Sequence, residues 1–234
     1  MILCIETATS LCSVALCDRN GINGLKENAE GRSHASLLTV FIDELLKEQG
    51  LKTNDLEAVA VSKGPGSYTG LRIGVSVAKG IAYASSIPLI GIDTTLSMFR
   101  GFLPAAKEKY RISGSDLFCP VLDARRMEVF YSVYNCEGIQ VKETCAEIID
   151  ITSFKEYPES SRIFVFGEGA AKCKEVIGRK NIIVCEEFKI SASFMHVPVY
   201  EAFDKACFED TAYFEPFYLK DFLVSKPVIN ILGR

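Results

Sequence analysis

The chain has 234 residues, a formal net charge of −4 and 48% hydrophobic residues. This length suits one large or two small domains, and the composition is that of a globular protein with a well-buried core. The acidic balance argues against a protein that binds RNA by itself, because contacts with phosphates need a basic surface. No uncharged run approaches the ~18 apolar residues that a membrane span requires.

The cysteines and the first residues favour a reducing compartment. Nine cysteines are scattered along the chain without a C-x-x-C pair, so we expect small buried hydrophobic residues rather than disulfides or a zinc site. The first ten residues lack the positive stretch of a signal peptide. We therefore expect a cytoplasmic protein.

The first elements are three strands and a helix. Strands are predicted at Ile2–Ile5 and Ser13–Leu16, joined by the polar turn Glu6–Ser10, with a third strand around Gly24–Asn28. Ser33 can cap a helix that runs through Gln49. Its apolar stripe is wider than core packing alone needs, so a partner could cover the rest. The stripe consists of Leu37, Leu38, Phe41, Ile42, Leu45 and Leu46.

A second strand–turn–helix unit follows. Leu56–Val61 is typical of a short buried strand, and Gly64-Pro65-Gly66 predicts a tight turn. Ser67 or Thr69 can then cap a helix that begins near Gly70.

That helix is unusual in its side chains. Its only charges up to Ser86 are Arg72 and Lys79, and small residues recur every fourth position. Each glycine inside a helix costs about 1 kcal/mol against alanine, so another surface must approach closely enough to offset the loss. Packing on the protein's own sheet and packing on another subunit both remain open. The small residues are Gly66, Gly70, Gly74, Ala78 and Ala82.

The second half repeats the pattern of the first. Strands are predicted at Leu117–Asp123 and Glu128–Tyr134, and another follows the turn at 135–138. The spacing from Glu6 to Gly21 equals that from Asp123 to Gly138, which indicates a duplicated βββ unit. The predicted elements after it are a strand at Ile163–Phe166, a helix at Gly169–Ile177, a strand at Ile182–Cys185 and a helix near Phe194–Phe208.

The segment GPGSYTGLRIGVSVAKGIAY, residues 64–83, closely resembles the motif of the TsaB family of bacterial threonylcarbamoyl-adenosine biosynthesis proteins. The likeness extends from Met1 to about Leu219 and is strongest over residues 1–20 and 59–95. It implies an α/β fold of two actin-like (ribonuclease H-like) subdomains, each of mixed sheet plus helices, the second smaller. We expect them at 1–100 and 101–234.

The resemblance also implies a role without a catalytic site. TsaD, the paralogue with the modifying site, carries two metal-binding histidines four residues apart, and here the corresponding segment Ile92–Met98 has neither. A lone Asp93 is a poor transition-metal site, so no metal is expected. Two departures from the family are Glu6, where Asp is commoner, and Lys220, where Arg is frequent.

The implied function is that of a partner and activator of the TsaD subunit. With a TsaE-like ATPase, the complex threonylcarbamoylates adenosine 37 of ANN-decoding tRNAs, and tRNA would be bound only through the complex. We expect a homodimer when the chain is alone. The partner-binding residues predicted on the two helices are Leu38, Phe41, Ile42, Leu45, Gly70, Gly74, Ala78 and Ala82.

Nucleotide binding is the main alternative. In an actin-like fold, Glu6, Thr7 and Thr9 lie where a phosphate loop would be, but Ala8 replaces the glycine that close backbone approach often needs. An ordinary polar turn is the favoured interpretation, and we expect no cofactor. Gly64–Gly70 lacks the Walker pattern. Gly167–Ala170 is compatible with a loop on the adenosine side of a nucleotide, but a strand-to-helix turn explains its two glycines equally well.

No catalytic residue is predicted. The two histidines, His34 and His196, each have the context of a single hydrogen-bonded side chain, and no G-x-S-x-G or H-E-x-x-H motif occurs. An ATP-dependent kinase of the same fold and, less favoured, a peptidase remain as alternative functions.

Overall fold

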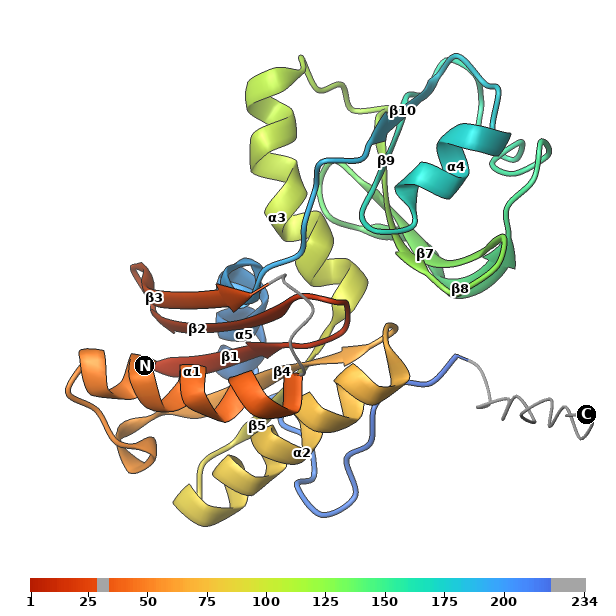
Figure 1. Cartoon of the computed structure of the whole chain (residues 1–234). Coiled ribbons are helices and arrows are strands. Elements are labelled where there is room, and N and C mark those ends of the chain that lie inside the picture. Colours follow the sequence, from red (N-terminus) through yellow and green to blue (C-terminus); the bar gives the residue numbers. More distant parts are fainter. Residues whose placement is uncertain (29–33, 220–234) are drawn as a thin grey trace, which may run out of the picture.

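The computed structural model describes residues 1–28 and 34–219, which form two lobes, each built on a five-stranded sheet (Figure 1). The first lobe contains β1 (Ile2–Glu6), β2 (Cys12–Asp18), β3 (Gly21–Asn28), α1 (His34–Glu48), the 3-10 turn η1 (Thr53–Asp55), β4 (Ala58–Gly64), α2 (Tyr68–Ser85) and β5 (Leu89–Asp93). Helix α3 (Thr94–Lys109) leads to the second lobe.

The second lobe contains β6 (Leu117–Asp123), β7 (Glu128–Asn135), β8 (Gln140–Ile148), β9 (Ile163–Phe166), α4 (Ala170–Val176) and β10 (Ile182–Cys185). The 3-10 turn η2 (Ala192–Met195) and α5 (His196–Asp204) follow.

The two sheets share one topology. Their orders are β3-β2-β1-β4-β5 and β8-β7-β6-β9-β10, with three antiparallel strands followed by two parallel ones. The predicted βββ repeat is therefore confirmed, and with it the fold class of two mixed α/β subdomains. Among the described residues, no helix combines the length and the hydrophobicity needed to cross a bilayer.

Strand β1 is buried on both faces, which explains its nearly continuous hydrophobic sequence. Leu3 and Ile5 pack under α1 and α2, whereas Ile2 and Cys4 pack against η2 and α5 on the other side. Five of the nine cysteines are buried, as predicted, whereas three are half-buried and Cys207 is exposed.

Helix α5 lies on the sheet of the first lobe, although the expected boundary assigned it to the second. Met195 and Val199 belong to the apolar cluster that also contains Ile2, Ala60 and Ile90. The division at residue 100 stays a proposal. The contacts show that the chain returns to the first lobe after β10.

Three local details differ from the sequence prediction or refine it. Ser67 caps α2, with its Oγ accepting from the Gly70 amide at 3.2 Å, and the predicted cap Ser33 lies outside the described residues. The last helix ends at Asp204 rather than near Phe208, and Ala206 is left-handed. Helix α3 was not predicted, because its buried first turn is polar and it contains Gly101 and Pro104.

Candidate functional site

The small-residue stripe of α2 faces the protein's own loop and sheet, which is one of the two arrangements that the sequence left open, and a role of these residues in partner binding stays a prediction. A Cβ on Gly70 would overlap the carbonyl oxygen of Thr7, and a Cβ on Gly74 would overlap the Thr7 hydroxyl. Ala78 and Ala82 are buried in the core of the first lobe. The glycines therefore let α2 lie directly on the β1–β2 loop.

Three of the predicted contact residues on α1 are also internal. Leu38, Ile42 and Leu45 are buried in the same core, whereas Phe41 is only half-buried. Partner binding by these buried side chains would require the core to open.

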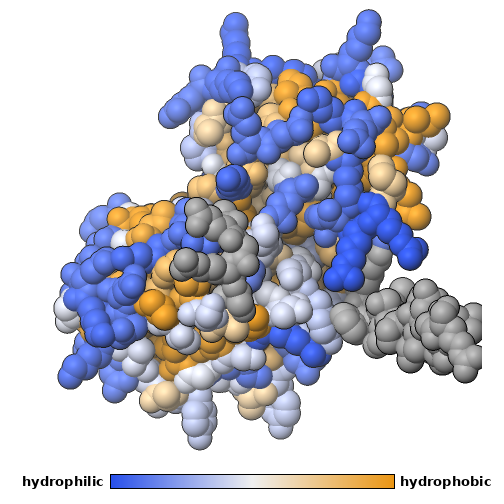
Figure 2. Space-filling view, viewed as in Figure 1, coloured by the Kyte–Doolittle hydropathy of each residue, from blue (hydrophilic) through white to orange (hydrophobic). Residues whose placement is uncertain are grey.

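Five half-buried apolar side chains and the exposed Val40 flank the buried stripes of both helices. We name them the α1–α2 surface: Leu37, Val40, Phe41, Ile73, Val77 and Ile81. Val40 is the most open of them, at 45% exposure. Hydrophobic side chains are visible over these helices on the first lobe in Figure 2. This surface is what the two helices offer to a partner without unfolding.

The two charges of α2 hold the C-terminal segment, residues 207–219, against the helix. Lys79 Nζ donates to the carbonyl oxygens of Ala212 and Phe214, at 3.1 and 2.9 Å. Arg72 Nε donates to the Tyr218 hydroxyl at 3.1 Å. Phe214 is buried in the core of the first lobe, so this segment completes the packing around α2.

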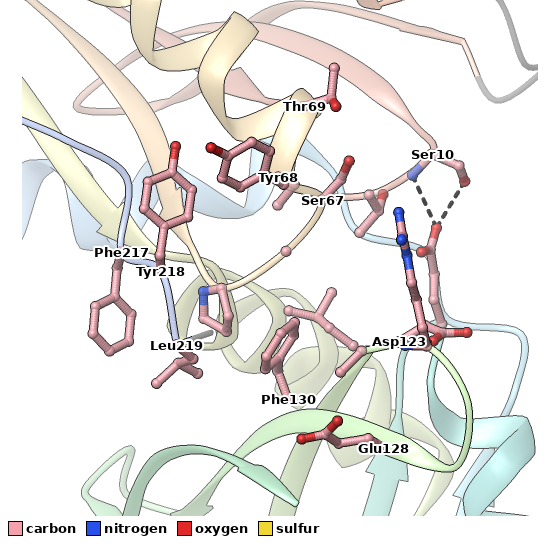
Figure 3. Close-up of a pocket in the computed structure, with 18 of the residues that line it drawn as sticks. Ser10, Ser67, Tyr68, Thr69, Asp123, Glu128, Phe130, Phe217, Tyr218 and Leu219 are labelled. Atoms are coloured by element: carbon pink, nitrogen blue, oxygen red, sulfur yellow. Dashed lines mark hydrogen bonds between the residues drawn. The ribbon is translucent and has the colours of Figure 1, made fainter. Parts of the chain in front are cut away.

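A cleft of about 710 Å³ lies between the lobes (Figure 3). Its walls are loops from both lobes and the C-terminal segment. The first lobe contributes residues 8–10, His34 and 65–69; the second contributes residues 122–126, Glu128, Phe130 and Glu168; the C-terminal segment contributes residues 217–219. The lobes touch at Ser10, whose hydroxyl donates to Glu168 Oε1 at 2.9 Å.

Of the three residues in the predicted phosphate loop, only Thr9 lines the cleft. The Glu6 carboxyl is fully buried, accepting from the Ala8 amide at 2.7 Å and from the Ser62 hydroxyl. Thr7 is buried beneath α2.

The backbone of this loop is already engaged. The Ala8 carbonyl accepts from the Ser67 amide at 2.6 Å, and the Leu11 amide donates to Thr9 Oγ1 at 3.2 Å. A phosphate cradle needs amides that point outward, and the Ala8 and Leu11 amides point inward. The loop therefore does not fit a nucleotide phosphate in the way the fold would suggest.

The other candidate loops have structural roles. In the loop from β9 to α4, Gly167 is left-handed at φ 111°, and a Cβ there would overlap Met98. His34 Nε2 lies 3.3 Å from the Leu11 carbonyl oxygen, and His196 Nε2 lies 2.9 Å from that of Asp18. Each histidine is a single hydrogen-bonded side chain, as predicted.

The segment that lacks the metal-binding histidines does not fit a metal. Asp93 Oδ2 lies 3.6 Å from the Lys63 ammonium, which already supplies a positive charge. Within residues 1–28 and 34–219, no three His, Cys, Asp or Glu side chains are grouped as metal ligands would be.

Two features of the cleft were missed. The consecutive arginines at 125 and 126 lie between two predicted strands without a recognisable motif, and residues 217–219 gave no signal beyond the resemblance. Both depend on contacts between segments far apart in sequence.

The fold and the cleft define a two-lobed actin-like protein in which the β1–β2 loop, where a nucleotide phosphate would be expected, is held by hydrogen bonds within the protein. Two solved structures from Pseudomonas aeruginosa share the fold: one described as YeaZ, the other as an uncharacterized protein with similarity to peptidase YeaZ. Their TM-scores are 0.76 and 0.77, at 21% and 22% identity, with 93% and 94% of this chain and 99% of each of theirs covered. The family described as "TsaD: tRNA N6-adenosine threonylcarbamoyltransferase" matches residues 22–230, and the chain belongs to this family.

Relatives named "tRNA threonylcarbamoyladenosine biosynthesis protein TsaB" confirm the resemblance to TsaB. The protein from Escherichia coli K12 is 35% identical over 133 residues, covering 57% of this chain and 54% of its own. The protein from Haemophilus influenzae is 34% identical over 131 residues, covering 56% and 52%. The matched part thus spans about half the length of these two relatives.

Proposed function

We propose that this chain is a non-catalytic subunit that binds and activates a TsaD-type catalytic subunit. The reaction would be the threonylcarbamoylation of adenosine 37 in ANN-decoding tRNAs, in the cytoplasm, with a TsaE-like ATPase in the complex. Membership of the TsaD family and the names of the TsaB relatives support this role.

The proposal that the chain is not itself catalytic rests on the lysine–aspartate pair at the expected metal position. Lys63 and Asp93 form an ion pair where the paralogue is expected to hold a cation, and the histidines beside it are absent. A subunit with these side chains at the metal position would contribute a binding surface to the complex rather than catalytic groups.

The α1–α2 surface is the proposed contact with the partner. Its half-buried apolar side chains are supported from below by the core, so they hold their positions before binding. A specific interface of this kind needs on the order of 1,000 Å² of total buried area. The same surface would join two copies of the chain when the partner is absent, around a two-fold axis.

The test uses the full chain and a purified TsaD-type subunit from the same organism. Val40→Glu/Val77→Glu places two charges on the α1–α2 surface. We expect the affinity for the TsaD-type subunit to fall at least tenfold, because binding would remove those charges from water. Thr39→Glu/Ser76→Glu is the matched control on exposed positions of the same helices. Size-exclusion chromatography and tRNA modification by the mixture are the measurements.

Equal loss in both double variants would show that the assigned face is wrong. Modification of tRNA by this chain alone would refute the non-catalytic role.

A further inference from the structure

The turn between β6 and β7 holds two arginines in an unusual backbone conformation. Arg125 and Arg126 are consecutive and left-handed, with φ of 70° and 51°, a region that residues other than glycine rarely adopt. The Ala124 amide donates to the Glu128 carbonyl at 3.1 Å, and the Arg125 amide donates to Asp123 Oδ1 at 2.5 Å. The turn is thereby fixed, and both arginine side chains are exposed at the cleft.

The charges of these arginines are not neutralised within the described part of the chain. Asp123, which precedes the turn, accepts from Lys172 Nζ at 2.5 Å. Glu168, across the cleft wall, accepts from Ser10. Neither the Arg125 nor the Arg126 guanidinium has an ion pair or hydrogen bond among residues 1–28 and 34–219.

Exposed apolar side chains lie in the turn and where β8 ends, opposite the start of β7. The Ile149 amide donates to the Met127 carbonyl at 2.8 Å, which ties the end of β8 to the turn. Met127, Ile148 and Ile151 are 38%, 67% and 71% exposed. Figure 2 shows hydrophobic residues along this edge of the second lobe, next to strongly hydrophilic ones. We name Arg125, Arg126, Met127, Ile148 and Ile151 the turn surface.

We propose that the turn surface docks an acidic segment of a partner protein. Carboxylates of that segment would pair with Arg125 and Arg126, since guanidinium groups bind carboxylates in bidentate fashion, and an apolar side chain would cover Ile148 and Ile151. A fixed turn lowers the conformational entropy lost on binding.

The chemistry around the arginines favours such a segment over RNA. Asp123 and Glu168 line the same cleft, and a nucleic acid carries a charge at every phosphate that would meet them. A peptide can place its carboxylates opposite the arginines alone. The exposed isoleucines also offer an apolar contact that phosphates cannot use. This surface contains none of the residues of the α1–α2 surface, so it stands or fails independently of the proposed function.

Fluorescence anisotropy with the full chain tests the proposal. The probe is a labelled 12-residue peptide of alternating glutamate and leucine, compared with a lysine–leucine peptide and a single-stranded 12-nucleotide RNA. Arg125→Glu/Arg126→Glu should weaken binding of the acidic peptide at least tenfold, and Ile148→Ser/Ile151→Ser at least threefold. The control Lys107→Glu/Arg111→Glu changes the net charge equally, at one exposed position within α3 and one just after it. It should change the affinity for the acidic peptide by less than twofold.

Three results would overturn the proposal. The wild-type protein could fail to bind the acidic peptide or fail to prefer it over the basic one. Both charge-reversed double variants could bind equally well. The RNA could bind tenfold more tightly than the peptide and be lost in Arg125→Glu/Arg126→Glu, which would make the surface a nucleic-acid site.

Discussion

At the scale of single residues, Glu6 shows how an expected ligand-facing acid became an internal one. It ends β1, where the fold places an acid near a nucleotide, but its carboxyl is fully buried. Burial raises the pKa of Glu6 to about 7, although hydrogen bonds from Ser62 and Ala8 act in the opposite direction. The side chain therefore fixes the loop instead of meeting a ligand.

Replacing Glu6 with glutamine should remove a pH dependence of stability. The folded pKa lies above the unfolded value of 4.5, so the folded state holds more protons between these values and stability falls as pH rises from about 4.5 to about 7. From pH 5 to pH 8 the free energy of unfolding of the wild type should fall by about 2–3 kcal/mol relative to that of Glu6→Gln. Denaturant unfolding of both proteins at the two pH values measures the difference.

Other carboxyls titrate in the same way in both proteins, so the comparison isolates Glu6. A constant difference between pH 5 and 8 would mean that Glu6 is ionised in the folded protein at pH 5.

At the scale of elements, α2 is shaped by what lies against each of its faces. Glycines allow contact with the β1–β2 loop, and two charged residues hold the C-terminal segment. Gly80, in contrast, has open space where a Cβ would be. The same residue type thus has opposite significance at two positions of one helix.

Gly74→Ala and Gly80→Ala form a matched pair that tests this interpretation. The added methyl at Gly74 would collide with Thr7, so we expect about 1–3 kcal/mol of destabilisation. At exposed Gly80 alanine should raise the free energy of unfolding by up to about 1 kcal/mol, since it favours helix. Chemical denaturation measures both.

If Gly74→Ala instead kept full stability and lost partner binding, the small-residue stripe of α2 would face another subunit, which is the second arrangement considered from the sequence.

Sequence patterns predicted which residues form α2 but not what they touch. The stripe of small residues was evident from its spacing, whereas its neighbour Thr7 lies more than 60 residues earlier in the chain. Likewise, Gly101 resembles a helix breaker in sequence, yet it makes room for the Phe194 ring against α3. Local sequence patterns predict helices and strands, whereas the contacts that determine the candidate site join segments far apart in the sequence.

At the scale of the whole molecule, two lobes enclose a cleft that in this fold often holds a nucleotide. The Ala8 and Leu11 amides are engaged within the β1–β2 loop, and Ser10 bridges to Glu168 of the opposite lobe. These contacts favour a cleft that is not built for phosphates.

Calorimetry with Mg–ATP and the isolated chain should accordingly show no event at micromolar concentration. The amides that would bind phosphate are engaged, and breaking their internal hydrogen bonds costs free energy. A nucleotide-binding actin-like protein titrated in parallel is the positive control. Clear micromolar binding with phosphoryl transfer would shift the assignment to the kinase class.

The return of the chain to its first lobe has a consequence for synthesis on the ribosome. One face of the first sheet, with Ile2, Ala60 and Ile90, packs against η2 and α5. Roughly 100 residues separate the end of β5 from that cover, which takes about 5–20 s to translate at 5–20 residues/s. During that interval the nascent chain exposes an apolar sheet face, so the first lobe emerges early but is completed late.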